Sequence, residues 1–459
     1  MSRIVILGAG PTGLGAAYRL QELGHQDWDI YEQHDYIGGL ATSFRDEKGF
    51  TYDVGGHVLF SHYKYYDDLV DKLLGGNYTE IMRESWIWMM DRFVPYPFQN
   101  NIKYLPREQV LECLLGLIEA QQERRPSSNF AEWINSTFGD GIAKYFMLPY
   151  NFKVWAHPAH MMSKQWMAER VSMVDRERVL RNVILDRDDV SWGPNNRFKY
   201  PLHGGTGGIY SGFLPYVESH LHLRKTARRV NLRAKVVEFD DGTSTNYDAL
   251  ITTLPIDQLV TWANDIPSSV RQAASGLFHS SSYIVGVGVA RACPSQKCWI
   301  YFPEDNCPFY RVTYLSNYSP FIAPDANHFL LLTETSYSAW KPEDKEQIVQ
   351  RVVQGLIDTG LLEEVDRTRI AATRLIDVPY SYPVPTVERD DALAIIQPFL
   401  MSHDVYSRGR FGAWLYEIGN MDHSVMQGVE VVNNILLGEA ETTWQPKQTA
   451  KQQHALSVA

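Results

Sequence analysis

The stretch from residue 4 to residue 32 is the sequence feature that most constrains the fold. Four apolar β-formers, Ile4–Leu7, run directly into glycines spaced G-x-G-x-x-G, and a helical pattern continues through Leu23. A second short strand, Trp28–Tyr31, ends at an acidic residue, Glu32. A glycine triplet alone is weak evidence. Together with the strand before it, the helix after it and the acid about twenty residues on, it predicts the first βαβ unit of a dinucleotide-binding fold.

The three glycines of this motif have separate roles. Gly8 allows the tight turn, Gly10 lets the backbone approach a pyrophosphate, and Gly13 lets the helix pack close to the strand. The pyrophosphate is expected on free N–H groups at the positive end of the helix, where Thr12 lies. Glu32 is placed to accept hydrogen bonds from a ribose.

Two further glycine pairs favour a flavin over a free nicotinamide. The first is followed by a leucine in Gly38-Gly39-Leu40, and the second precedes a histidine in Gly55-Gly56-His57. Such pairs indicate backbone packed against a long, permanently held cofactor at several points. A nicotinamide enzyme needs only the first loop, so the predicted cofactor is FAD.

A second helix start is expected near the C-terminus. Ser424 precedes a helical pattern that runs through Leu436, and its side chain is placed to cap that helix. This cap would leave another helix N-terminus available to the flavin.

The composition excludes some classes of function. The net charge of −11, from 43 basic and 54 acidic residues, speaks against a nucleic-acid binder. Any phosphate ligand must therefore be held by local arginines. No apolar run reaches the length of about eighteen residues that a membrane span needs. Met1 leads straight into the first strand, so no signal peptide is expected and a cytoplasmic location is predicted.

No metal site is predicted. The four cysteines form no C-x-x-C pair, so free buried thiols are favoured over a zinc site. His157 and His160 have a spacing that ligands can use, but Pro158 between them disfavours a helix that would aim both rings at one ion.

The pattern along the chain predicts an α/β fold, in which a Rossmann-like FAD-binding domain carries a helical insertion and an antiparallel β-sheet domain. The FAD-binding domain is expected to be discontinuous, and the last residues are polar and expected to be disordered. The predicted ranges are 1–90 with 195–275 and 400–440 for FAD binding, 100–190 for the helical substrate domain, 91–99 with 276–399 for the sheet domain, and 441–459 for the disordered tail.

Hydrophobic periodicity predicts the individual elements. Helices are expected over 62–74, 209–221 and 345–359, and a strand pair over 86–94. Further strands are expected over 226–230, 235–239, 244–247, 249–254, 283–290, 298–302, 309–314, 329–335 and 370–378.

The segment 146–155 stands out because it has four aromatic residues within ten positions. Aromatics at helical spacing usually belong to a core. Here Pro149 breaks the helical pattern, and Asn151 and Lys153 are interleaved with the rings. A stacking site for a flat ring and a plain core segment are both compatible with this pattern.

Longer strings resemble UDP-galactopyranose mutases of the form typical of eukaryotes, over residues 8 to about 428. These strings are 52–57 with 60–65, 94–101, 149–156, 301–311 and 409–412. They are long and chemically unusual. Other flavoproteins, such as amine oxidases and protoporphyrinogen oxidase, resemble the chain mainly in its nucleotide-binding segments.

The resemblance implies an isomerase that interconverts UDP-galactopyranose and UDP-galactofuranose. In that family N5 of reduced FAD acts as the nucleophile at the anomeric carbon, without net redox change, and NADPH or NADH is the implied reductant. The implied partner is a nucleotide sugar, with a homo-oligomer as a further possibility. Two alternatives stay open at this stage: a related sugar (arabinose, fucose or N-acetylgalactosamine), and an FAD-dependent amine or porphyrinogen-type oxidase.

The resemblance also assigns site residues, position by position. Arg170 and Arg311 match the pair that holds the diphosphate, and His57 matches a loop histidine near the flavin. The other residues implied to contact substrate are Tyr96, Gln99, Phe146, Tyr150, Asn151 and Trp155 at the uridine, Asn195 and Trp299 beside the sugar, and Tyr301, Tyr382 and Tyr416 at the phosphates. Residues implied to contact flavin are Val230, Arg410, Gly419 and Asn420, and those implied to bind NADPH are Arg83 and Ser85.

Overall fold

The computed structural model describes residues 2–123, 126–167, 173–190 and 196–447. Two of the residues assigned by resemblance, Arg170 and Asn195, lie outside the described residues. None of the helices in the described ranges combines the length and apolar character that a bilayer crossing requires.

A five-stranded parallel sheet forms around the glycine motif, in the order β19-β13-β1-β2-β9. The strands are β1 (Ile4–Leu7), β2 (Trp28–Tyr31), β9 (Leu221–His222), β13 (Ala249–Thr252) and β19 (Val405–Ser407). Alternate residues of β1 belong to different cores. Ile4 and Ile6 join the core on one face of the sheet, and Val5 and Leu7 join the core on the other. Burial on both faces explains why β1 is apolar at every position.

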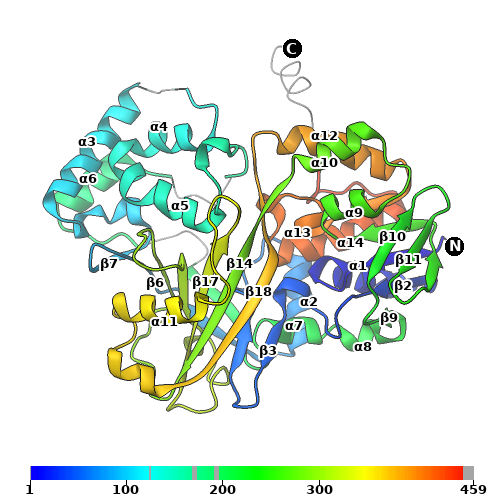
Figure 1. Cartoon of the computed structure of the whole chain (residues 1–459), viewed down its shortest axis with the longest axis horizontal. Helices are drawn as coiled ribbons and strands as arrows, with labels where there is room; N and C mark the ends of the chain where they lie inside the picture. Colours follow the sequence, from blue (N-terminus) through cyan, green and yellow to red (C-terminus); the bar gives the residue numbers. More distant parts are fainter. Residues whose placement is uncertain (1, 124–125, 168–172, 191–195, 448–459) are drawn as a thin grey trace.

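Helices cover both faces of this sheet (Figure 1). The Ile4 face packs against α1 (Pro11–Glu22) and α14 (Met421–Leu437). The Val5 face packs against α9 (Ile256–Trp262), α10 (Ser268–Ser275), α12 (Arg389–Met401) and a three-stranded sheet of β10 (Ala227–Asn231), β11 (Val236–Phe239) and β12 (Ser244–Asn246).

Glycines let α1 and α14 touch backbone to backbone. A Cβ atom on Gly15 would lie 2.5 Å from the carbonyl oxygen of Val425, and one on Gly428 would lie 2.1 Å from that of Thr12. Both distances are far below contact, so only glycine fits at these positions. The start of α14 is thereby held beside the glycine-rich turn that begins α1.

A seven-stranded sheet forms the middle of the molecule, in the order β18-β14-β17-β16-β15-β6-β7. All neighbours are antiparallel except β15 and β6. Its strands are β6 (Ser85–Met89), β7 (Arg92–Pro95), β14 (Phe278–Val289), β15 (Trp299–Tyr301), β16 (Arg311–Tyr314), β17 (Phe329–Tyr337) and β18 (Ile370–Val384), and α11 (Ile348–Asp358) packs on it. The long strands β14 and β18 lie in the middle of the molecule, with its two ends on either side of them (Figure 1).

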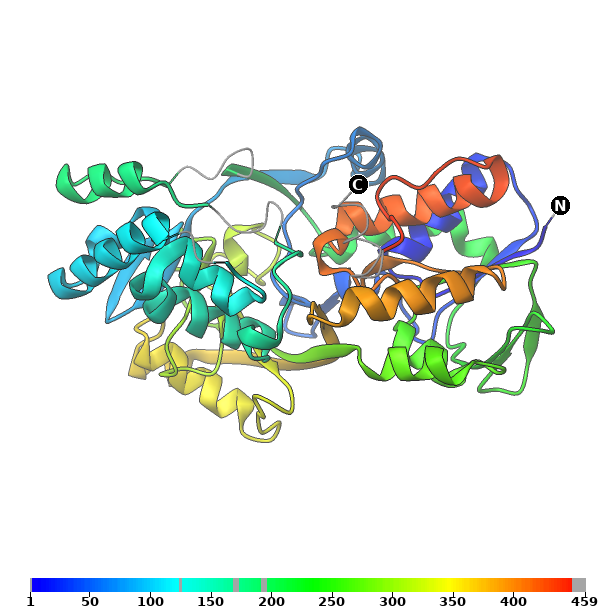
Figure 2. The same ribbon diagram turned by 90° about the horizontal axis from the view of Figure 1, so that it is seen from above.

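The helical insertion lies at the end of the molecule opposite the N-terminus (Figures 1 and 2). It consists of α3 (Arg107–Glu123), α4 (Phe130–Ile142), α5 (Leu148–Trp155) and α6 (Arg176–Ile184), with a π-helical turn over Ala143–Met147 before α5. Its core includes Phe98, Phe146 and Trp155. Smaller elements complete the fold: α2 (Lys64–Leu74), β3 (Ser43–Arg45), β4 (Thr51–Asp53), β5 (Tyr78–Met82), β8 (Arg197–Pro201) and α13 (Gly409–Gly412).

The predicted α/β architecture, with a dinucleotide-binding sheet, a helical insertion and an antiparallel sheet, is confirmed. The predicted helix over 209–221 is wrong. It is divided into α7 (Gly207–Ser211) and α8 (Leu214–Val217), and the chain then enters β9. Pro215 lies in the first turn of α8 and cannot continue a preceding helix, so a new helix begins there.

Three further differences concern boundaries. Residue 90, the expected end of the first FAD-binding segment, lies inside the β6–β7 hairpin, which belongs whole to the seven-stranded sheet. The cap of α14 is Asn420 rather than Ser424, which is buried within the first turn. Residues 441–447 were expected to be disordered but are packed: the Glu441 carboxylate pairs with Arg408, and Trp444 is buried.

Candidate active site

The glycine-rich turn combines two crowded glycines with one open one. A Cβ atom on Gly8, whose φ is +96°, would lie 2.2 Å from the hydroxyl oxygen of Thr253. One on Gly13 would lie 1.9 Å from the carbonyl oxygen of Gly8. At Gly10 the nearest atom would be the Cα of Gly39, at an ordinary contact distance of 3.8 Å. Gly8 and Gly13 are therefore required by packing, whereas the protein itself does not require glycine at position 10.

The second glycine pair packs against this turn. The Gly38 N–H donates to the carbonyl of Ala9 over 2.8 Å, and a Cβ on Gly39 would lie 3.1 Å from the Cα of Gly10. Leu40 follows in the same 3₁₀ turn. The helix α1 begins at Pro11, its N-cap residue Gly10 provides no side-chain cap, and Thr12 lies in its first turn. Uncapped N–H groups and close glycine backbones form a cradle suited to an anion such as a pyrophosphate.

Glu32 lies at the carboxyl end of β2, beside the same turn. Its two carboxylate oxygens accept hydrogen bonds from the backbone N–H groups of Ala9, at 2.8 Å, and His34, at 2.9 Å. Each oxygen keeps a further lone pair, so the carboxylate is held in place and can still accept from a ribose hydroxyl. Val230 is buried in β10 in the same core as Val5 and Leu7, and its carbonyl accepts from Asn264 over 3.0 Å.

Arg311 and Glu334 form a mostly buried ion pair between neighbouring strands, here called the fork. Arg311 on β16 is the direct partner of Glu334 on β17, and Nε and Nη2 donate to the two carboxylate oxygens over 2.6 and 2.7 Å. The Gly56 backbone closes the network, because its N–H donates to Glu334 and its carbonyl accepts from Arg311. Burial alone would raise the pKa of Glu334, but the charge and hydrogen bonds of Arg311 lower it. The guanidinium is therefore fixed in direction by an ionised partner.

His57 follows this glycine pair directly. Its Nδ1 atom is buried and has no hydrogen-bond partner among the described residues. Burial lowers the pKa of His57, Arg311 and Arg410 act in the same direction, and Asp53 and Glu334 oppose them. A buried imidazole nitrogen normally has a hydrogen-bond partner, and a bound cofactor could supply the partner that Nδ1 of His57 lacks here. His57 and the glycine pair before it therefore fit an FAD.

Hydroxyl groups gather beside the fork. The Tyr310 hydroxyl donates to Glu334 over 2.7 Å and lies 3.0 Å from the Tyr382 hydroxyl. Arg410 lies over the rings of Tyr382 and Tyr416, 4.9 and 5.5 Å from their centroids. It also donates to the carbonyls of Ser381 and Gly419, each over 3.1 Å. Gly419 and Asn420 lead directly into α14, so Arg410 joins the tyrosines to the start of that helix.

Arg83 lies against two of the predicted aromatic residues, Tyr96 and Trp299. Its guanidinium carbon lies 5.0 Å from the centroid of Tyr96 and 4.9 Å from that of Trp299. Its Nε donates to the Ser85 hydroxyl over 2.8 Å. The predicted group of Arg83, Ser85 and Tyr96 is thus brought together in space.

The expected aromatic platform is assembled from three parts of the chain. The ring of Tyr301 lies 5.1 Å from Tyr96 and 5.3 Å from Tyr150. Phe146 is stacked against Tyr150 and Phe98 and is only 3% exposed, and Trp155 is 1% exposed. Phe146 and Trp155 therefore support the tyrosines as core residues in this conformation.

Two polar residues of the predicted platform also have partners or are covered. Gln99 is buried in the 3₁₀ turn after β7, and the Asn151 amide donates to the carbonyl of Met147 over 2.7 Å.

Sequence reasoning missed Glu334 and Tyr310, although one signal was present. Glu334 is a lone acid in the run Phe329–Thr335, whose other residues are apolar or uncharged, and a buried carboxylate in such a strand needs a cationic partner. Asp53 was also missed as a structural residue. It is fully buried and accepts from Tyr200, Ser43 and Thr206, so it binds the glycine-rich segment around residue 206 to β4.

In the described ranges, His62, Asp422 and His423 are close enough together to hold a metal ion. Direct hydrogen bonds already account for their arrangement. The Nδ1 atoms of His62 and His423 lie 2.9 and 3.0 Å from the two oxygens of Asp422. Burial would raise the pKa of Asp422, but hydrogen bonds from both histidines and the charge of His423 lower it to about 2. This group, here called the histidine clamp, fixes the loop after His57 to the start of α14.

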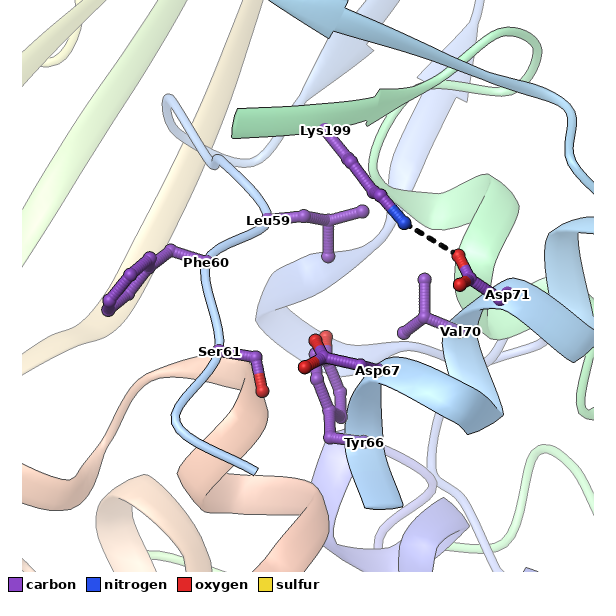
Figure 3. Close-up of a pocket in the computed structure, with 8 residues that line it drawn as sticks. All are labelled: Leu59, Phe60, Ser61, Tyr66, Asp67, Val70, Asp71 and Lys199. Atoms are coloured by element: carbon purple, nitrogen blue, oxygen red, sulfur yellow. Dashed lines mark hydrogen bonds and ion pairs between the residues drawn. The ribbon is translucent and has the colours of Figure 1, made fainter. Parts of the chain in front are cut away.

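Two pockets lie near the site but do not coincide with it. One of about 40 Å³ lies between residues 59–61, α2 and Lys199, whose ammonium pairs with Asp71 over 2.8 Å (Figure 3). This volume is too small for a nucleotide. The other pocket has a volume of about 330 Å³, and Trp155 is the one predicted site residue among those that line it. His157, Phe278 and Trp340 also line this pocket.

Comparisons with known proteins agree on a flavoprotein family. The family model described as flavin containing amine oxidoreductase matches residues 11–435. A crystal structure of a reduced UDP-galactopyranose mutase is 43% identical, covers 96% of each chain and superposes with a TM-score of 0.94. A putative protoporphyrinogen oxidase from Exiguobacterium sp. has a TM-score of 0.73 at 19% identity, covering 95% of this chain and 99% of that one, and so shares the fold alone.

Curated relatives match over a shorter range. A 15-cis-phytoene desaturase from Glycine max is 37% identical over 303 residues, which is 56% of this chain and 48% of the desaturase. The chain therefore spans about half the length of the curated relatives that it matches.

Proposed function

Because the chain belongs to the flavin containing amine oxidoreductase family and, within it, to the UDP-galactopyranose mutases, we propose that it interconverts UDP-galactopyranose and UDP-galactofuranose. The observation that carries this proposal is the convergence of Arg311, Arg410 and a group of tyrosine hydroxyls beside His57. An isomerase of this kind must hold a diphosphate that leaves and returns, and such a site supplies cationic and hydroxyl donors for it.

Reduced FAD, when bound, supplies the nucleophile N5 for the anomeric carbon, so that substrate and product keep the same oxidation state. The residues proposed to hold FAD are Gly8, Gly10, Thr12, Gly13, Glu32, Gly39, Leu40, Gly55, Gly56, Val230, Arg410, Gly419, Asn420 and Ser424. The uncapped start of α1 and the close glycine backbones of Gly10 and Gly39 support this assignment.

Arg311 is proposed to stabilise the charge on the departing diphosphate. Nε and Nη2 of Arg311 are held by Glu334, and Nη2 also donates to the Gly56 carbonyl, so the plane of the guanidinium is fixed. The N–H groups of Nη1 are the proposed donors to the substrate. Arg170, outside the described residues, is proposed as the second arginine. Burial and Glu334 raise the pKa of Tyr382, so its hydroxyl stays protonated and can donate to a phosphate oxygen.

The uridine is proposed to bind at the rings of Tyr96, Tyr150 and Tyr301. These rings lie between Arg83 and the start of α5, and they rest on buried aromatic neighbours that fix their orientation. Gln99 and Asn151 are the proposed amide contacts, while Trp299 and Asn195, the latter outside the described residues, are proposed beside the sugar.

NADPH or NADH is the proposed reductant, with Arg83 and Ser85 as its contacts. A related sugar in place of galactose is a second candidate. An oxidase is not favoured, because the fork and tyrosine group give an oxidase no advantage. A cytoplasmic location and assembly into a homo-oligomer remain predictions.

The test is direct turnover. Protein loaded with FAD and reduced under anaerobic conditions is incubated with UDP-galactofuranose, and the mixture is separated by chromatography. We expect UDP-galactopyranose to accumulate, with many product molecules for each NADPH oxidised. One NADPH oxidised per product, or full activity with the flavin held oxidised, would contradict the proposed isomerase.

A further inference from the structure

Lys153 and Cys307 form a buried pair. Neither residue has a role in the proposed function, although other residues of the same two segments do. The ammonium Nζ of Lys153 lies 3.6 Å from the Sγ of Cys307. The two residues are 2% and 5% exposed. Lys153 belongs to α5 and Cys307 to the connection between β15 and β16, so the pair joins segments that are 154 residues apart in the chain.

Backbone carbonyls hold the Lys153 ammonium in the part of the chain that the structure describes. Its Nζ donates to the carbonyls of Glu304, over 2.7 Å, and Cys307, over 2.9 Å, and no carboxylate within the described residues forms a salt bridge with it. Burial lowers the pKa of the Lys153 ammonium, which favours the neutral amine. The Cys307 thiol donates to the carbonyl of Phe309, so the sulfur keeps its lone pairs free toward Nζ. A nucleophilic amine and a thiol are thus held against each other.

We propose that Lys153 and Cys307 form a reversible covalent cross-link when the protein meets hydrogen peroxide. In the first step the amine accepts the thiol proton, and the thiolate sulfur attacks one peroxide oxygen. The O–O bond breaks, the leaving hydroxide takes the proton from the ammonium to form water, and the sulfur becomes a sulfenic acid. The sulfur is oxidised by two electrons and the peroxide is reduced by two.

In the second step the Lys153 nitrogen attacks the sulfenic sulfur. The S–O bond breaks and an N–S bond forms. The hydroxide that leaves combines with a proton from the nitrogen to give a second water. One thiol, one amine and one peroxide therefore become one sulfenamide and two waters. A thiol such as dithiothreitol reverses the bond by attacking sulfur and releasing the amine.

Cys307 is 5% exposed and lies at a turn of the chain, where we expect a small oxidant such as hydrogen peroxide to reach it. It directly follows two exposed residues, Asp305 and Asn306, at the turn of the β15–β16 connection. Burial raises the pKa of the Cys307 thiol to about 11, and Lys153 opposes that rise.

The bond would change the geometry of the proposed substrate site. The segment α5 also carries Tyr150 and Asn151, and the connection from β15 to β16 begins at Tyr301 and ends at Arg311. An N–S bond replaces a 3.6 Å contact and leaves the nitrogen a single N–H, so at least one of its two hydrogen bonds to backbone carbonyls is lost. Oxidation would thereby change the distance between α5, which carries Tyr150, and the connection that ends at Arg311.

Peptide mass mapping of the full-length protein tests this inference without any assay of the isomerase. The protein is treated with hydrogen peroxide, free thiols are blocked, and the digest is analysed with and without dithiothreitol. We expect a linked peptide containing Lys153 and Cys307, about 2 Da lighter than the two peptides together, because two hydrogens are lost. Trypsin should fail to cleave after Lys153 in that species, and dithiothreitol should restore cleavage.

Three variants make the result specific. Cys307→Ser removes the sulfur, and Lys153→Arg keeps the charge but cannot supply a neutral amine, so neither should form the linked peptide. Cys298→Ser is the matched control: Cys298 is equally buried and bonds the Met82 carbonyl instead of a lysine, so its loss should leave the cross-link unchanged. If Cys307 is recovered only as free thiol or as higher oxides, with normal cleavage after Lys153, the inference is wrong.

Discussion

At the scale of single residues, the most consequential feature is that Arg311 has two roles. It is the proposed diphosphate contact, and it is the counter-ion of Glu334, a buried carboxylate. Truncating Arg311 therefore does more than remove a substrate contact, because it also leaves a charge without a partner in a dry strand pair. A simple loss of activity in such a variant would not separate the two roles.

A double substitution separates them. Arg311→Met alone is expected to lower the free energy of unfolding by about 3–5 kcal/mol, because Glu334 is left ionised and unpaired. Arg311→Met with Glu334→Gln should recover most of that stability, since the neutral amide can keep the Tyr310 hydrogen bond. Turnover should stay severely reduced in both. Urea unfolding and the chromatographic assay measure the two effects, and recovery of turnover in the stable double variant would show that Arg311 acts only structurally.

Arg83 provides a second residue-scale test. Its guanidinium lies over Tyr96 and Trp299 at the edge of the site, where it is proposed to bind NADPH. Arg83→Ala should slow flavin reduction by NADPH about tenfold or more, the loss expected for one charge-assisted contact. Turnover started with dithionite should change much less, because the fork is intact. Anaerobic stopped-flow absorbance follows the reduction, and equal losses with both reductants would place Arg83 at the substrate instead.

At the scale of elements, the glycine turn separates packing from ligand binding. Gly13→Ala must push its Cβ into the Gly8 carbonyl, so it should destabilise the protein with or without cofactor. Gly10→Ala meets no atom closer than 3.8 Å, and Gly10 has an ordinary φ of −78°, so the cofactor-free protein should keep its stability within about 0.5 kcal/mol. The same variant should bind FAD at least tenfold more weakly. Isothermal calorimetry with FAD and urea unfolding give the two readouts, and normal FAD affinity would mean that no phosphate approaches Gly10.

The histidine clamp joins two other elements, the loop after His57 and the first turn of α14. The pKa of Asp422 is lowered from an ordinary 3.8 to about 2 in the fold, so its contribution is complete above pH 4 and is lost as pH falls toward 2. That contribution is about 2 kcal/mol, of which about 1 should disappear between pH 5 and pH 3. The stability difference between wild type and Asp422→Asn should shrink by this amount. A constant difference across that interval would contradict the clamp.

The elements also show which features a sequence can predict. The βαβ unit is local: its strand, glycines and acid lie within thirty residues, so their spacing alone predicts it. The fork of Arg311 and Glu334 depends on the pairing of β16 with β17, and the Tyr310–Tyr382 contact depends on residues from two distant strands. Such contacts are set by register across a sheet, which periodicity within one segment does not contain. Pro215 indicates the division of 209–221 into two helices, because a proline disfavours the interior of a helix. The single helix was predicted from the apolar pattern, without weighing this proline.

At the scale of the whole molecule, the C-terminal segment ties together parts that the sequence separates widely. The Arg408 side chain, at the end of β19, is 0% exposed, and it donates to both oxygens of Glu441, each over 2.6 Å. Its guanidinium also lies 3.5 Å from the ring centroid of Trp444. Lys447 reaches Glu417, next to Tyr416 of the proposed site, over 3.2 Å. The polar, Gln-rich composition of this region predicted disorder. One tryptophan and one acidic residue are too weak an indication of packing to outweigh that composition.

Truncation after Ala440 tests how much the molecule depends on this segment. Removing Glu441 and Trp444 leaves the buried Arg408 without its counter-ion, so the free energy of unfolding should fall by about 3–5 kcal/mol. Truncation after Lys447 retains every one of these contacts and is the matched control. Arg408→Met in the shorter protein should recover part of the loss, because it removes the unpaired charge. The segment also contacts Glu417 beside Tyr416, so the shorter protein should bind UDP more weakly while keeping its FAD. Equal unfolding midpoints for the two truncations would mean that the segment covers Arg408 without stabilising it.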